Sequence, residues 1–140
     1  GAPEAPPEKA EFFLGGNPGK AWFVIAPSTA YVVALREDRV CAVFAQRANA
    51  DEAHVGFSAL VGTAPEPLVA VAQDAATLGP QDPHTRTVAY SWSRPEDKDE
   101  LLFVLTTSDS PDATAQAMVS MSLVGKANNS FKAMPLRGTP

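Results

Sequence analysis

Cysteine is almost absent from this sequence, since Cys41 is the only one among 140 residues. An intramolecular disulfide is therefore excluded, and a packed core has to hold the fold. Cys41 lies inside an apolar run, where a buried and unreactive thiol is the usual state. A lone cysteine of this kind fits any cellular compartment, so cysteine usage leaves the location open.

Positive charge is also scarce. The 11 Lys and Arg residues are outnumbered by 16 Asp and Glu residues, which gives a formal net charge of −5 and a pI near 4.9. An acidic surface repels phosphate backbones and anionic lipid headgroups. Nucleic acids and membrane surfaces are therefore poor candidate partners.

Long apolar runs are missing as well. No segment approaches the roughly 20 consecutive apolar residues that cross a bilayer, and no signal-peptide pattern stands at the N-terminus. The sequence begins with Gly1 and continues with a run rich in Pro and Glu, which favours a trimmed start. We therefore expect that an export signal has been removed.

The residues that are present are typical of a folded protein. Apolar residues make up 45% and charged residues 19%, a balance found in globular chains. A chain of this length has room for one substantial core. We predict a flexible N-terminal tail over residues 1–11, a single α+β domain over residues 12–124 and a C-terminal tail over residues 125–140.

Alternating apolar residues predict three strands in the first half of the chain. Turn formers fill residues 15–19, and the strands follow at residues 20–26, 29–35 and 40–46. In the second strand Tyr31, Val33 and Leu35 share one face, which we expect to be the buried face. Short turns between the runs predict antiparallel hairpins.

A change of period after these strands predicts a helix over residues 50–61. Asn49 is a good N-cap, and Glu52 three residues later completes a capping box. Gly62 is placed to end the helix. The residues expected on its packed face are Ala50, Ala53, Phe57, Leu60 and Val61.

The second half of the chain predicts further strands. Residues 68–72 fit either an edge strand or a packed loop, and residues 85–92 alternate clearly. Residues 101–106 are apolar on both faces, as in a central strand. Residues 113–124 fit a strand better than a helix. The fold class is therefore α+β, with an antiparallel sheet of about five or six strands and one main helix packed on one face.

The glycine-rich run from Gly15 to Lys20 does not meet the requirements of a phosphate-binding loop. Such a loop needs four residues between its glycines, a Ser or Thr after the lysine and a following helix. Here three residues separate Gly15 from Gly19, Ala21 follows the lysine, and a strand comes next. An ordinary turn is the better interpretation.

Other chemical motifs are equally weak. Cys41, His54 and His84 match no spacing of metal ligands, and the acidic residues 96–100 fit an exposed hairpin tip. No Gly-x-Ser-x-Gly motif occurs. We therefore assign no catalytic, cofactor-binding or metal residues and expect no cofactor. The alternative is a small hydrolase or metal-dependent enzyme that uses Cys41 and the histidines.

Aromatic residues give the candidate interaction surface. Any aromatic side chain that projects from an uncovered sheet face would be a strong anchor for a partner. The candidates are Trp22, Tyr90, Trp92 and Phe131. Phe131 belongs to the C-terminal tail with Met134 and Leu136, and we expect this tail to pack onto the sheet, with a homodimer as the alternative.

A likeness to known proteins rests on residues 19–22, 31–35 and 39–44, on the predicted helix that contains Phe57, and on residues 101–107 and 116–118. Through these segments, which span roughly residues 12–124, the chain resembles a family of small exported proteins and lipoproteins of Gram-negative bacteria whose activity is uncharacterised. The resemblance implies a periplasmic or envelope-associated location and no site residues. Together with the missing catalytic motifs, it predicts a non-enzymatic binding or envelope-assembly module that meets a protein partner through a sheet face or edge.

Overall fold

A computed structural model describes residues 2–25, 27, 29–74 and 82–126. Within these residues the protein forms one antiparallel sheet of seven strands and two helices. The elements in chain order are α1 (Pro7–Leu14), β1 (Gly19–Ile25), β2 (Ala30–Arg36), β3 (Cys41–Ala45), α2 (Ala50–Val61), β4 (Val69–Gln73), β5 (Thr85–Ser93), β6 (Asp99–Ser108) and β7 (Ala117–Gly125).

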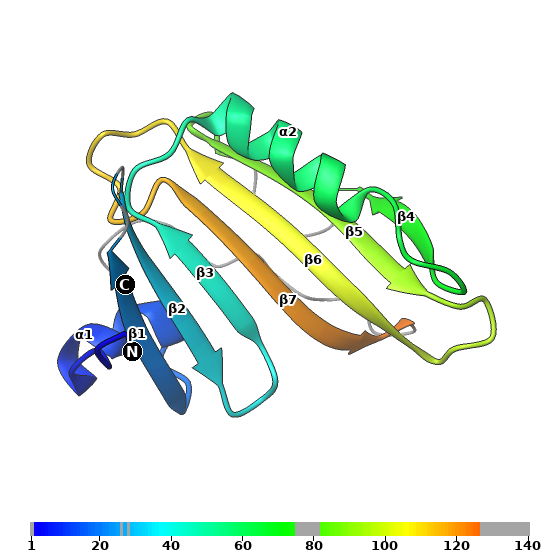
Figure 1. The fold of residues 1–140 in the computed structure, drawn as a ribbon, viewed down its shortest axis with the longest axis horizontal. Coiled ribbons are helices and arrows are strands. Elements are labelled where there is room, and N and C mark those ends of the chain that lie inside the picture. The colour runs from blue at the N-terminus through cyan, green and yellow to red at the C-terminus, as the bar shows by residue number, and fades with distance from the viewer. Residues whose placement is uncertain (1, 26, 28, 75–81, 127–140) are drawn as a thin grey trace.

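The strands lie in the order β1-β2-β3-β7-β6-β5-β4, so the chain makes one long crossing (Figure 1). The first three strands form consecutive hairpins. The chain then leaves the middle of the sheet through α2, reaches the far edge at β4 and returns by hairpins to place β7 beside β3. α2 therefore lies on the sheet because the connection between β3 and β4 has to pass over it.

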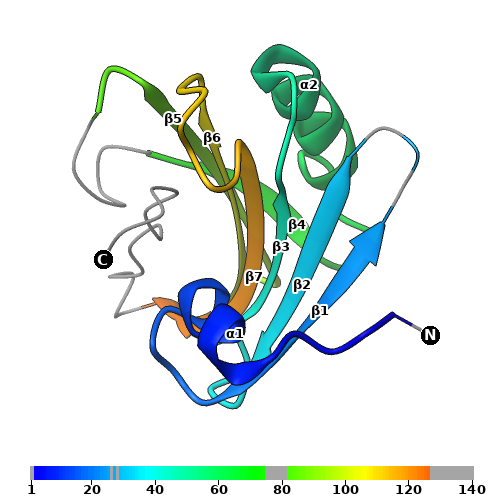
Figure 2. The same ribbon diagram turned by 90° about the vertical axis from the view of Figure 1, so that its left-hand side faces the viewer.

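The register of the sheet assigns each side chain to one of two faces, because directly paired residues point to the same side. One row joins Val33, Val43, Val119 and Leu105, and Leu105 packs against α2. The neighbouring row joins Val32, Phe44 and Met118, which pack with α1 residues. The two helices therefore cover opposite faces of the sheet (Figure 2).

α2 is formed and held as the sequence predicts. The side-chain oxygen of Asn49 accepts a hydrogen bond from the backbone N–H of Glu52 at 3.0 Å, which caps the helix. Phe57 and Val61 are buried against the sheet. The indole N–H of Trp92 donates to the carbonyl of Val61 at 2.8 Å and fixes the C-terminal end.

The other face carries α1, which the sequence does not predict. Its Ala10 and Leu14 are buried, and the ring of Phe13 meets that of Phe44 edge-on at 5.0 Å between centroids. Residues 3–5 also bond to β1, since the N–H of Ala5 donates to the carbonyl of Ala21 at 2.7 Å. The predicted tail over residues 1–11 therefore has to be corrected.

The physical reason for this error lies in the prolines. The three prolines in residues 1–11 are typical of a tail, whereas a proline at the first helical position favours a helix start. Pro7 occupies that position, and Gly15 ends the helix with a left-handed φ of 60°. The glycine-rich run after α1 is thus the turn into β1, as predicted.

The structure confirms the predicted strands and the antiparallel sheet, but the predicted number of strands is too low. Each of the predicted strands is present, residues 69–73 form an edge strand, and residues 117–125 form a strand and not a helix. The sheet has seven strands where the sequence predicts five or six, and two helices where it predicts one main helix. In β2 the predicted faces are reversed, since Val32 and Ala34 are the buried residues while Leu35 is 50% exposed.

No helix among the described residues is long and apolar enough to span a membrane. The predicted packing of the C-terminal tail, with Phe131, Met134 and Leu136, lies outside the described residues.

Candidate binding surface

α2 covers only part of its face of the sheet. Its side chains and backbone contact β5 and β6, through Tyr90 with Ser58 at 3.4 Å and His54 with Thr107 at 3.0 Å. Figure 1 shows α2 running along these two strands, while no described element lies over β1, β2 and β3 on this side. We call this uncovered region, together with the adjoining Met121 and Leu123 of β7, the open half of the sheet.

The open half is apolar, although it faces solvent. Leu35, Met121 and Leu123 retain exposed fractions of 50%, 41% and 51%. A single exposed apolar side chain needs no explanation, but a contiguous set marks a surface that binds something. The rows of the register place the following residues side by side on it: Trp22, Val24, Tyr31, Val33, Leu35, Cys41, Val43, Met121 and Leu123. Lys20 of β1 pairs with Leu35 and adds one charge at the margin of this surface.

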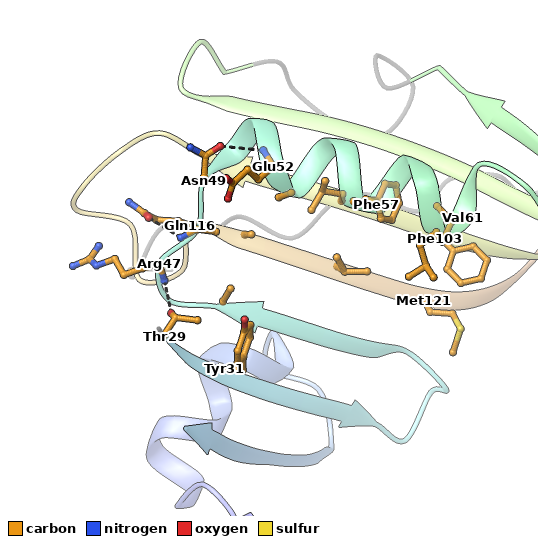
Figure 3. A pocket seen from close by; sticks show the side chains of 18 residues that line it. Thr29, Tyr31, Arg47, Asn49, Glu52, Phe57, Val61, Phe103, Gln116 and Met121 are labelled. Atoms are coloured by element: carbon orange, nitrogen blue, oxygen red, sulfur yellow. Dashed lines mark hydrogen bonds between the residues drawn. The ribbon is translucent and has the colours of Figure 1, made fainter. Parts of the chain in front are cut away.

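A groove separates the open half from α2, with a volume of about 1050 Å³. Small side chains create this space: Ala45 and Ala117 form part of the floor, and Ala53 and Gly56 stand on the helix wall. Figure 3 shows Tyr31 and Met121 on the sheet side of the groove and Phe57 and Val61 on the helix side. The groove can therefore accept an apolar body.

The polar groups at one end of the groove maintain the local fold. The hydroxyl of Thr29 accepts a hydrogen bond from the backbone N–H of Arg47 at 3.1 Å. The side-chain amide oxygen of Gln116 accepts one from the backbone N–H of Ala48 at 3.0 Å. These bonds hold the connection between β3 and α2. Two exposed charges, Arg47 and Glu52, line the same end of the groove.

The outward side of α2 is acidic in its first turn, at Asp51 and Glu52, and apolar after it. Val55 and Leu60 retain exposed fractions of 72% and 74%, and a methyl group added at Gly56 would meet no atom within 4 Å. The prediction that Leu60 belongs to the packed face is therefore wrong. Leu60 lies about 60° around the helix from Phe57, which turns it toward the groove instead of the floor.

The aromatic residues predicted to form one interaction surface lie in different places in the structure. Trp22 lies on the open half, in the row of Val33. Tyr90 and Trp92 lie beneath α2, where the Trp92 ring meets that of Phe103 at 4.6 Å between centroids. Phe131 lies outside the described residues.

The residues of the alternative enzymatic hypothesis are not assembled into a site. The His54 ring contacts Thr107, whereas Cys41 lies beside Met121. These two places in the sheet are four residues apart along the strands. Four residues correspond to about 13 Å of strand. His84 bonds instead to Asp109 at 3.0 Å on the surface. No group of three or more His, Cys, Asp or Glu residues in the described ranges could hold a metal ion.

Two environments nevertheless shift a pKa in this part of the fold. Partial burial, and then the positive charge of Arg86, lower the pKa of His54 below its ordinary value. At the hairpin tip, hydrogen bonds from Arg94 lower the pKa of Asp97. Asp97 accepts from the guanidinium of Arg94 at 2.9 Å, so this carboxylate stabilises the turn. The predicted exposed tip over residues 96–100 is too long, because Asp99 and Glu100 belong to β6 and Glu100 is buried.

Comparisons with protein-family models, with curated proteins and with solved structures found no match to this chain. The resemblance to exported proteins and lipoproteins stays a prediction, and the function has to be argued from the surface itself.

Proposed function

We propose that this protein is a non-enzymatic binding module that holds a protein partner on the open half of its sheet. In line with the resemblance, we place this module in the periplasm or at the cell envelope, where it would serve binding or envelope assembly. The observation that carries the proposal is the contiguous apolar surface beside α2, with Leu35, Met121 and Leu123 each about half exposed. Apolar surface of this kind gains free energy when a partner removes it from water.

Two features favour the open half, and not the edge strands of the sheet, as the place where a partner binds. Residues 3–5 already bond to part of the free edge of β1. The other edge strand, β4, has five residues, and a short edge strand offers few main-chain groups to an added strand. The open half, in contrast, spans three whole strands.

Site-specific crosslinking tests the proposal. A photoreactive phenylalanine analogue would replace Leu35 or Val43 on the open half, and Val71 in a control variant. Val71 is 51% exposed and pairs with Ser91, so it faces away from α2. In cells that naturally make the protein, we expect specific adducts from the first two positions only. Absence of adducts there, or the same adducts from Val71, would contradict the proposal.

A further inference from the structure

After the exposed acids Asp51 and Glu52 in its first turn, α2 carries exposed apolar residues on sides that the sheet does not reach. Val55 is 72% exposed and is not among the residues that line the groove, because it projects from the side of the helix away from the sheet. Leu60 is 74% exposed and stands at the rim of the groove. Exposed apolar residues that adjoin a groove in this way mark a binding surface.

This distribution restricts what can bind. A small apolar ligand or a single peptide lying in the groove would cover Leu60 but leave Val55 in water. Covering both residues requires an occupant that fills the groove and also receives α2 in a hollow of its own.

The protein itself has that shape. α2 forms a ridge about 10–12 Å high on one half of the sheet, and the open half beside it is a hollow of similar depth. Seven strands spaced by about 4.8 Å span roughly 29 Å, and helices pack at 8–10 Å from one another, so the sheet has room for a second helix beside α2.

We propose that a second copy of this chain occupies the open half of the sheet. In this arrangement a two-fold axis runs parallel to α2, and each copy seats its α2 in the groove of the other. Two sheets then enclose one layer of two helices. The contact is isologous and closes on itself, as in most homodimers. This inference rests on the proposed function, because it takes the open half to be the binding surface.

The residues at the contact fit this symmetry. Gly56 lies on the helix side that would face the partner's α2, and the lack of a side chain there permits close approach. Val55 and Leu60 would enter the apolar hollow of the other copy. A two-fold axis parallel to the helices also brings corresponding ends together. Glu52 of each copy would thus approach the end of the groove where Arg47 of the other copy lies.

Analytical ultracentrifugation of the purified chain from low to high micromolar concentration tests the inference. We expect the average mass to rise from 14.7 kDa toward twice that value. Leu60→Glu should raise the dissociation constant by at least about tenfold, because a buried apolar anchor becomes a charge. Val71→Glu is the matched control: it makes the same change at an apolar residue that is 51% exposed on the opposite face, and it should dimerise like the parent chain.

A charge exchange tests the geometry separately. Glu52→Arg and Arg47→Glu should each weaken the dimer, and the double variant should recover most of the loss. Both side chains are exposed, and circular dichroism checks that the variants fold.

The outcomes separate this inference from the proposed function. A monomer at every concentration, or a dimer that survives Leu60→Glu, overturns the second copy as occupant. If such a monomeric chain still gives crosslinks from Leu35 to a different protein or to a lipid, the open half remains a binding surface with another occupant. Absence of both the dimer and the crosslinks overturns the two proposals together.

Discussion

Replacement of Gly56 by alanine should make the monomeric chain more stable. Gly56 lies in the interior of α2, where glycine is less favourable than alanine by about 0.5–1 kcal/mol because its backbone loses more freedom on folding. The added methyl group meets no atom within 4 Å, so no strain offsets the gain. For a domain of this size the melting temperature should rise by roughly 2–6 °C.

Urea unfolding measures this effect, with an unchanged dependence on denaturant showing that the two states keep their surface areas. Gly62→Ala is the matched control, because it makes the same chemical change at the end of the same helix. There the added carbon would lie 2.4 Å from the carbonyl oxygen of Ser58, and we expect destabilisation of about 1–3 kcal/mol. A loss of stability in Gly56→Ala at concentrations where the chain is monomeric would refute the reasoning, since it would mean that another part of the same chain fills the space beside α2.

Three further predictions concern the contacts of α2. Asn49→Ala should lower the free energy of unfolding by about 1 kcal/mol in urea titrations, because the cap on Glu52 is lost. Trp92→Phe removes the hydrogen bond to the carbonyl of Val61 and should cost about 1–3 kcal/mol by the same method, whereas an unchanged midpoint would show that the bond is dispensable. The folded state lowers the pKa of His54 from its ordinary 6.5, so the unfolded chain takes up a proton first as the pH falls. Stability should therefore decline below about pH 6.5, and His54→Gln should show a flatter profile of melting temperature against pH.

Much of the fold could be predicted because local signals agreed with the final contacts. The helix over residues 50–61 has both its cap and its apolar period in the sequence, and the structure places it at those residues. The apolar residues on both faces of residues 101–106 predict a central strand, and β6 lies between β5 and β7 with Leu102, Val104 and Leu105 buried. α1 escaped prediction because its apolar residues are few and follow a proline-rich run.

The binding surface could be predicted only in part. Trp22 was named as a candidate from its residue type, and it does lie on the open half. Tyr90 and Trp92 have the same kind of sequence neighbourhood, yet they lie beneath α2. The difference depends on which strands the helix crosses, and that is decided by the pairing of β3 with β7, two segments more than 70 residues apart at Cys41 and Met121. No local pattern carries this information.

The composition of β2 nevertheless contains a sign of the open half. A strand with one face in water usually alternates between apolar and polar residues, whereas β2 has apolar residues on both faces. Val32 and Ala34 account for one face, since they are buried on the side of α1. Val33 and Leu35 on the other face are not needed for strand formation, because threonine shares the β-branched shape of valine and forms strands equally well. β2 thus has the residue pattern of a strand that is covered on both sides, and within the described residues α1 provides only one of the two covers.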